Sequence, residues 1–371
     1  MSRTSLLRPL VIGLWAGMLL LPFAGITAAL TLFACVAAGL FLFFNARKLG
    51  VAEAVKASLP FSPAGLPYLR TAALPLAVVA SLAVPFGMKD YYLDVLIVAG
   101  IYILLALGLN VIVGFTGLLN LGFAAFYAIG AYTYALLNTK MGLGFWPSLP
   151  LAAAAAALAG LLVAVPALRL RGDYLAIVTL GFGEILRLVL NNWDSLTNGP
   201  NGIGGIAPPS LAGFSLGTLN AYYYVVLLFV FLGIVVIGRV ERSRIGRAWV
   251  AIRENEIAAA SMGINTTRYK LYAFAFGTFW AGIAGTLFSA KMRFISPESF
   301  TFMESIMVLS MIILGGIGTI HGAVLGAFLL VVLPEVLREV QVYRMLLLGI
   351  GLVLLMIFRP QGLMGKTGVT R

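Results

Sequence analysis

Long stretches of uncharged, mostly apolar residues alternate along the chain with short polar or basic segments. The stretches 9–46, 95–139 and 195–238 contain no Asp, Glu, Lys or Arg. A bilayer crossing needs only about 20 such residues in a helix, so the pattern predicts many membrane helices bounded by charge or by Gly and Pro. The predicted helices lie near residues 10–24, 27–44, 71–86, 93–113, 117–137, 149–168, 174–190, 221–238, 271–290, 305–314, 320–333 and 342–358.

The composition supports this interpretation and excludes several classes of protein. Of 371 residues, 61% are hydrophobic and 10% are charged, against about 45–50% and 25% in soluble domains. The single cysteine and the single histidine, His321, exclude an internal disulfide and any site built from several Cys or His ligands. We therefore expect an all-α polytopic membrane protein with about 10–12 transmembrane helices and no metal or other cofactor.

The N-terminal region is predicted to form a unit of its own. The apolar run 9–46 is about twice as long as one crossing requires, so we divide it into two helices at 22–25, where Pro and Gly occur. Residues 45–70 are basic and then proline-rich, as in an interfacial helix followed by a linker. Residues 1–70 would then form a membrane hairpin and linker, and residues 71–371 the core. The alternatives for residues 1–45 are a single crossing or a signal sequence.

The distribution of basic residues predicts the orientation. If the N-terminus is cytoplasmic, most Lys and Arg side chains fall on the inner side, which is the usual bias of membrane proteins. Only six fall on the outer side: Lys89, Lys140, Lys291, Arg293, Arg338 and Arg344. The formal net charge of +12 is then explained by topology, without nucleic acid. We expect a multi-pass membrane protein with both termini in the cytoplasm.

The inner segment 239–270 is the long charged loop of the chain. Residues 245–262 lack proline and are good helix formers, and Gly263 stands where a helix commonly ends in a left-handed conformation. Small side chains at Ala258 and Ala259 would let another protein approach the backbone closely, with charges such as Arg247 and Glu256 setting the register. The sequence therefore predicts a helical docking element. The alternative is a solvated amphipathic linker.

The outer segment 191–220 is polar and rich in turn-forming residues, including Gly199-Pro200-Asn201-Gly202 and Pro208-Pro209. Such a segment could be a docking surface for an external partner or a simple hairpin, and the sequence leaves both possibilities open.

The inner segment resembles a known coupling element. Ala258, Ala259 and Gly263 are similar to the Ala-Ala-x-x-x-Gly part of the loop by which permeases of ATP-binding-cassette importers hold their ATPase subunits. The family pattern has Glu directly before the two alanines, whereas this chain has Ile257 there and Glu256 one step earlier. The resemblance implies coupling roles for Arg247, Glu256, Ala258, Ala259 and Gly263.

Further blocks of sequence resemble the LivM-type permeases of branched-chain amino acid importers. They occur in order from about residue 90 to the end, at 114–122 (GFTGLLNLG), 170–184 (LRGDYLAIVTLGFGE), 198–203 (NGPNGI), 296–300 (SPESF), 314–318 (LGGIG) and 358–363 (FRPQGL). This resemblance implies a permease core pairing with a LivH-type second permease, two cytoplasmic ABC ATPases and a periplasmic binding protein that selects leucine, isoleucine or valine. Related permeases carry other amino acids, urea or amides, and the sequence does not decide between these substrates.

Two polar features lie within predicted membrane helices. Glu184 and Arg187 are three residues apart, which places them on one face of a helix, where they could pair or face a zwitterionic amino acid in the translocation path. Asn120 lies among Gly114, Gly117 and Gly122 and could form an interhelical hydrogen bond or line the pore.

The segment 305–334 is uncharged and is interrupted by glycines at 315, 316 and 318. Each half is short for a full crossing, so a tight hairpin or a pair of broken helices is predicted. Gly322, Gly326 and Ala327 recur at about one-turn spacing and are predicted to form a close-packing face. His321 beside them is expected to have a structural role.

Other functions are poorly supported by the sequence. Gly365-Lys366-Thr367 resembles the end of a phosphate-binding loop, but Pro360 stands where its first glycine is needed. An importer would therefore need separate ATPases. A secondary transporter coupled to protons or sodium would be expected to carry an acidic or histidine relay, for which Glu184 is the single candidate. We find no pattern typical of an enzyme.

Overall fold

The computed structural model describes residues 89–167, 172–211 and 214–336, together with positions 85, 349, 353 and 362–364. The chain divides into two compact units, Met1–Val79 and Ala80–Arg371, and every described residue belongs to the second. The hairpin and linker predicted for residues 1–70 lie outside the described residues. Nearly all residues of the helices predicted at 71–86 and 342–358 also lie outside the described residues.

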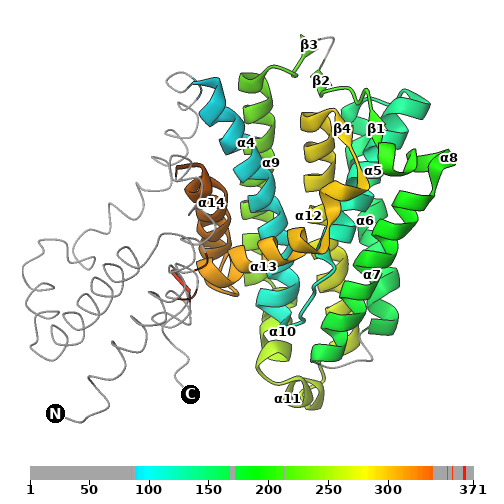
Figure 1. The fold of residues 1–371 in the computed structure, drawn as a ribbon. Coiled ribbons are helices and arrows are strands. Elements are labelled where there is room, and N and C mark those ends of the chain that lie inside the picture. The colour runs from blue at the N-terminus through cyan, green and yellow to red at the C-terminus, as the bar shows by residue number, and fades with distance from the viewer. Residues whose placement is uncertain are drawn as a thin grey trace, which may run out of the picture. The chain divides into compact units, whose positions relative to one another are not determined.

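The second unit consists of long helices, with strands of two residues each confined to one end (Figure 1). This confirms the predicted all-α class. Within the described residues, six helices are long and apolar enough to cross a membrane. The main helices are α4 (Asp90–Leu109) with the π-helical turn η1 (Asn110–Phe115), α5 (Phe123–Met141), α6 (Phe145–Ala167), α7 (Asp173–Asn192), α9 (Leu219–Arg242), α12 (Thr266–Met292), α13 (Phe302–Gly315) and α14 (Ile320–Val336).

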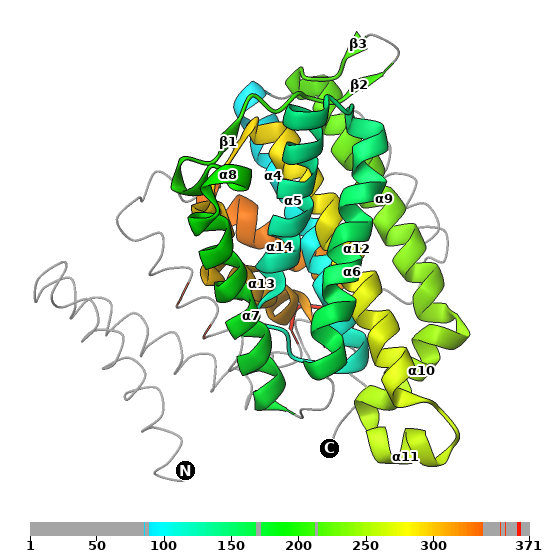
Figure 2. The ribbon, with the colours of Figure 1, turned by 90° about the vertical axis from the view of Figure 1, so that its right-hand side faces the viewer.

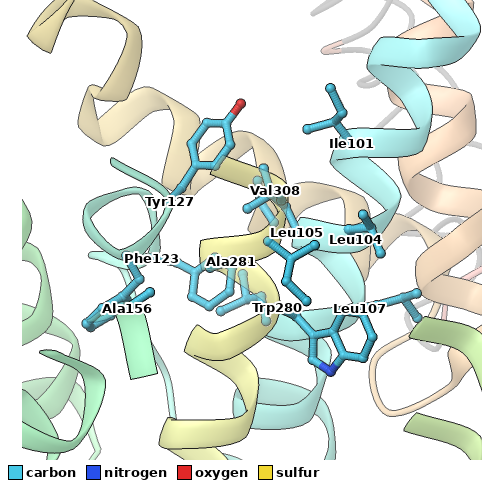
Figure 3. Close-up of a cluster of buried hydrophobic side chains, with 14 of the residues drawn as sticks. Ile101, Leu104, Leu105, Leu107, Phe123, Tyr127, Ala156, Trp280, Ala281 and Val308 are labelled. Atoms are coloured by element: carbon cyan, nitrogen blue, oxygen red, sulfur yellow. The ribbon is translucent and has the colours of Figure 1, made fainter. Parts of the chain in front are cut away.

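Helix α12 lies in the centre of the packed helices, against α4, α5 and α6. Its glycines allow the close approach. A Cβ added at Gly277 would lie 2.7 Å from the carbonyl oxygen of Gly108 on α4, and one added at Gly282 would lie 2.8 Å from Ala153 of α6. Small residues at helix crossings are typical of membrane proteins, where van der Waals packing replaces the hydrophobic driving force. Around these crossings, large side chains such as Trp280 fill the core (Figure 3).

The two ends of the helices differ in structure. At one end, β1 (Ile203–Gly204) pairs antiparallel with β4 (Phe294–Ile295), and β2 (Ser210–Leu211) pairs with β3 (Phe214–Ser215). The short helices α8 (Asp194–Thr197), η2 (Gly199–Asn201) and η3 (Pro297–Phe300) belong to the same two connections. The segment 191–220 thus contains a short hairpin, and its use as a docking surface for an external partner stays a prediction. At the opposite end lie α10 (Arg244–Glu254) and α11 (Glu256–Ser261), together with the last turn of α6 and the first turn of α7 (Figures 1 and 2).

The predicted helix starting at 117 begins later in the structure. Residues 117–122 are not helical, and α5 starts at Phe123. Gly117 has a positive φ of 72°, which ends the preceding turn. Gly122 packs so tightly on α7 that a Cβ there would lie 1.8 Å from the carbonyl oxygen of Thr179. The glycines of this segment therefore form an irregular connection rather than the first turns of a helix.

The segment after residue 301 forms the predicted broken hairpin. Helix α13 by itself has 14 residues, which corresponds to about 21 Å at 1.5 Å per residue and is shorter than a bilayer core. It reaches crossing length when it is taken together with η3, as the stretch Pro297–Gly315 of 19 residues. Residues 316–319 turn the chain back into α14. A Cβ at Gly315 would lie 1.8 Å from the carbonyl oxygen of Gly322, and one at Gly326 would lie 1.9 Å from that of Met311. This confirms the close-packing face at Gly322 and Gly326.

Candidate functional site

The loop 239–270 is helical but contains two helices where the sequence predicted one continuous element. The break falls at Asn255, whose backbone is extended (φ −161°, ψ 108°). Its side-chain Oδ1 accepts a hydrogen bond from the backbone N–H of Ala258 at 3.0 Å, which caps α11. Asparagine is a strong N-cap residue because its side chain satisfies an N–H that the helix leaves unpaired. The helical element predicted over residues 245–262 is therefore interrupted at this residue.

Gly263 ends α11 as the sequence predicts. Its φ is +83°, in the left-handed region. The N–H of Gly263 donates to the carbonyl of Ala260, and the N–H of Ile264 donates to that of Ala259. These two bonds form a Schellman motif, in which the last carbonyls of a helix are satisfied by a glycine turn. No heavy atom lies within 4 Å of a Cβ built at Gly263, so glycine is needed here for the backbone conformation alone.

Helix α11 presents a small apolar surface to its surroundings. The side chains of Ile257 and Met262 are 70% and 83% exposed, and Ala258 and Ala260 are also exposed, whereas Ala259 is buried. We call the exposed residues 257, 258, 260 and 262 the α11 tip. Large apolar side chains that project from an end of a helical protein indicate an interaction surface. The predicted alanine patch is thus exposed at Ala258 and turned inward at Ala259.

The charges predicted to set the register have partners within the chain. Glu256 Oε1 lies 2.6 Å from Nζ of Lys270, whose side chain is only 7% exposed. Arg247 is exposed on α10, and its Nη1 donates to the carbonyl of Arg242 at 2.9 Å. Glu256 therefore holds α11 against the start of α12, while Arg247 lies on the outer face of the loop.

Helix α10 contacts the membrane helices through Trp249 and Arg253. Trp249 is buried, stacks on Phe115 with ring centroids 6.5 Å apart, and donates from Nε1 to the carbonyl of Tyr269 at 2.7 Å. Arg253 donates from Nη1 to the carbonyl of Gly114 at 2.7 Å. That these side chains contact the membrane helices could not be predicted from the sequence, because both belong to a segment that also fits a solvated helix.

Glu184 and Arg187 pair on α7, as their spacing predicts. Arg187 Nε lies 3.0 Å from Glu184 Oε2, and Arg187 Nη1 lies 3.5 Å from Oε1 of Glu298 on η3. Glu298 is part of the SPESF block, but the sequence did not link it to α7. Two carboxylates therefore share one guanidinium. The side chains of Glu184 and Arg187 are 36% and 25% exposed, so the cluster is accessible at its edge.

A second polar contact inside the helices was missed by sequence reasoning. Tyr102 on α4 donates from its hydroxyl to Oε2 of Glu304 on α13 at 2.7 Å. Glu304 lies in the first turn of α13, at the edge of an apolar run. An acid at that position could have been found by searching for charges flanking the short helix, since ionisable residues in membrane segments often have a function.

Asn120 is fully buried in the connection before α5. Its Oδ1 accepts from the N–H of Gly122 at 3.0 Å, and its Nδ2 has no partner among the described residues. The side chain therefore stabilises its own loop, and among the described residues it makes no hydrogen bond to another helix. Among the described residues there is also no group of three or more His, Cys, Asp or Glu that could hold a metal ion.

These features define a class of protein. Apolar helices of membrane-crossing length, broken helices at one side and a helical loop projecting at one end are the features of a polytopic membrane permease. The family of permease components of branched-chain amino acid transport systems matches residues 91–356, and the chain belongs to this family. It is therefore a permease subunit of a branched-chain amino acid transport system.

Individual relatives agree with this assignment. The high-affinity branched-chain amino acid transport permease LivM of Salmonella typhimurium is 50% identical over 312 residues, which cover 78% of this chain and 73% of that protein. LivM of Escherichia coli K12 is 49% identical with the same coverage. LivH of Salmonella typhimurium, which is also a high-affinity branched-chain amino acid transport permease, is 27% identical over 293 residues. These cover 73% of this chain and 93% of that protein. No solved structure matches the chain.

Proposed function

We propose that this chain is the LivM-type subunit of an ATP-driven importer that moves leucine, isoleucine and valine across the bacterial inner membrane. It would pair with a LivH-type permease and work with two cytoplasmic ABC ATPases and a periplasmic amino-acid-binding protein. The chain's own role is to form half of the translocation path. The energy would come from ATP hydrolysis in the partner subunits.

The observation that carries this proposal is the α11 tip. It combines exposed apolar and small side chains with a Schellman glycine at Gly263, and it projects from one end of the helices. Its Ala-Ala-x-x-x-Gly pattern is that of the importer coupling loop. The net positive charge of the flanking segments supports a cytoplasmic location for this end by the positive-inside bias, where ATPases would bind.

The translocation path is assigned to the side of α7. This helix has the lowest buried share of the candidate spans, 22% against 78% for α4 with η1. Its Glu184–Arg187 pair is partly exposed, and charged groups facing lipid are costly. We therefore place this face toward the second permease and the path, where the pair would meet the ammonium and carboxylate of the substrate. Asn120 supports the adjoining loop from its buried position.

The experiment is ATP-dependent uptake by the complete complex. The chain is co-expressed with its neighbouring permease, ATPase and binding-protein genes, purified, and reconstituted in liposomes. We expect uptake of leucine, isoleucine or valine that requires ATP and the binding protein and persists when an ionophore collapses the ion gradients. Preferred uptake of urea or another amino acid would contradict the substrate. Uptake that needs no ATPase and stops with the ionophore would contradict the importer.

A further inference from the structure

The inner end of α4 continues into an irregular helical turn, and a side chain of the coupling loop forms a hydrogen bond with this turn. The last residues of this span, Asn110–Phe115, form a π-helical turn. The carbonyl of Gly114 at the end of this turn accepts a hydrogen bond from Nη1 of Arg253 of α10 at 2.7 Å. A cation at the C-terminal end of a helix also interacts favourably with the helix dipole. Arg253 thus caps α4 from another element of the fold.

The same π-turn holds the turn between α13 and α14. Asn110 is fully buried. Its Oδ1 accepts from the N–H of Gly318 at 2.9 Å, and its Nδ2 donates to the carbonyl of Thr319 at 3.2 Å. One side chain therefore binds both a donor and an acceptor of the turn, which fixes the turn in position and in orientation relative to α4.

Contacts between the coupling loop and this turn complete a continuous path. Trp249 stacks on Phe115 at the end of the π-turn. A Cβ built at Gly318 would lie 2.5 Å from Nη1 of Arg253 and 3.0 Å from the carbonyl oxygen of Gly114, so the guanidinium, the π-turn and the hairpin turn meet at one point. Energetic coupling between distant sites is carried by such packed and hydrogen-bonded networks when one element has alternative arrangements.

We propose that the π-turn Asn110–Phe115 transmits movement of the coupling loop to the α13–α14 hairpin, with Arg253 and Asn110 as positioning residues. The proposal rests on the coupling role of the loop under the proposed function. A π-turn is suited to this role because its wider turn interrupts the regular ladder of helix hydrogen bonds, and such turns occur frequently at functional sites. The hairpin that it holds is short and broken, as expected of an element that moves.

The test separates coupling from assembly. Arg253→Gln, Arg253→Lys and Asn110→Ala are made in the complete importer, and three quantities are measured: yield of the complex, ATP hydrolysis and substrate uptake. We expect Arg253→Gln to leave the yield and hydrolysis nearly unchanged while substrate transported per ATP falls about threefold or more. Arg253→Lys, which keeps a cationic donor, should recover part of the loss.

Two further comparisons make the result specific. Arg268→Gln removes an exposed positive charge from the same loop. It should leave the amount of substrate transported per ATP unchanged. The double variant Arg253→Gln, Asn110→Ala should be no worse than the more severe single variant, because both act on one path. The Arg253 variants test the idea even if Asn110→Ala fails to fold, because Arg253 is partly exposed.

Three outcomes for Arg253→Gln would overturn the inference. The first is an equal fall in ATP hydrolysis and in substrate uptake, the second is a lower yield of the complex with no other change, and the third is an unchanged amount of substrate transported per ATP. The first two would assign Arg253 to folding or assembly rather than to transmission. Absence of any ATPase from the wild-type complex would instead contradict the proposed function, so the two failures are distinguishable.

Discussion

The carboxylate of Glu256 and the ammonium of Lys270 lie 2.6 Å apart and join helix α11 to the start of α12. Glu256 is the residue displaced by one position from the glutamate of the importer coupling pattern. In this chain it points to a partner within the fold, and the exposed position before the two alanines belongs to Ile257. The displaced glutamate therefore has a structural partner within the chain, while the exposed α11 tip is apolar.

We predict that Glu256→Gln destabilises the loop, because the nearly buried Lys270 would lose its anion. Glu256 is itself 36% exposed, so solvent screening reduces the effect to roughly 1–3 kcal/mol, between the values for exposed and buried ion pairs. Thermal unfolding in detergent should show the loss. Glu254→Gln is the control, because its pair with Arg253 is more exposed, and it should change the midpoint much less. Equal midpoints for the two variants would contradict this prediction.

Gly263→Val should weaken binding of the ATPases. The residue has a φ of +83° and open space around it, so valine would encounter backbone strain of about 1–3 kcal/mol rather than a clash, and the helix end would change. Gly142→Val is a matched control, since Gly142 also caps a helix with φ +67° in open space but lies at the other end of the molecule. Co-purification of ATPases should fall for Gly263→Val alone. Asparagine at position 263, which tolerates this conformation, should retain binding.

Because Glu184 and Glu298 share the guanidinium of Arg187, substitutions at these three residues should differ in how much they harm folding or uptake. Arg187→Gln should harm folding or uptake most, because it leaves Glu184 and Glu298 without their cation. Glu298→Gln should have the smallest effect, since Glu298 is 71% exposed. Glu184→Gln should be more harmful than the double change Glu184→Gln, Arg187→Gln if the pair is mutually neutralising. Uptake and yield of the complex measure each effect, and equal results for the Glu184 single and double variants would rule out the pairing.

The hairpin α13–α14 should not tolerate a side chain at its contact. Gly315→Ala would place a methyl group 1.8 Å from the backbone oxygen of Gly322, where the flexible side chains that usually relieve a clash are absent. Overpacking of this kind costs about 1–3 kcal/mol or more. Gly181→Ala is the control, because nothing lies within 4 Å of its Cβ. Thermal stability in detergent should fall for the first variant only, and an equally stable Gly315→Ala would contradict the close packing.

Much of the fold follows from hydrophobic pattern. The apolar runs located α4, α6, α7, α9, α12 and both halves of the hairpin, because burial in a bilayer constrains composition over whole helices. The exact start of α5 could not be predicted, since the glycines at 117 and 122 are compatible with a helix until the partner backbone at Thr179 is known. The break at Asn255 was missed for a similar reason, because asparagine is tolerated within helices as well as at their caps.

The candidate site was predictable where its geometry is local. The Glu184–Arg187 pair depends on spacing within one helix, and the turn at Gly263 depends on the conformation of one residue. Contacts between distant segments were beyond the sequence. Arg253 with Gly114, Asn110 with Gly318 and Tyr102 with Glu304 depend on how helices are packed together, and nothing in a single sequence specifies which helices are neighbours.

Cross-linking from the α11 tip tests the central claim most directly. A cysteine is placed at Met262, which is 83% exposed, or at Met141, which is 70% exposed at the opposite end, in a chain whose natural Cys35 is replaced by alanine. We predict cross-links from position 262 to an ATPase subunit on the cytoplasmic side, and none from position 141. If position 262 is labelled from outside the cell, or fails to cross-link to any ATPase in the assembled complex, the account is contradicted.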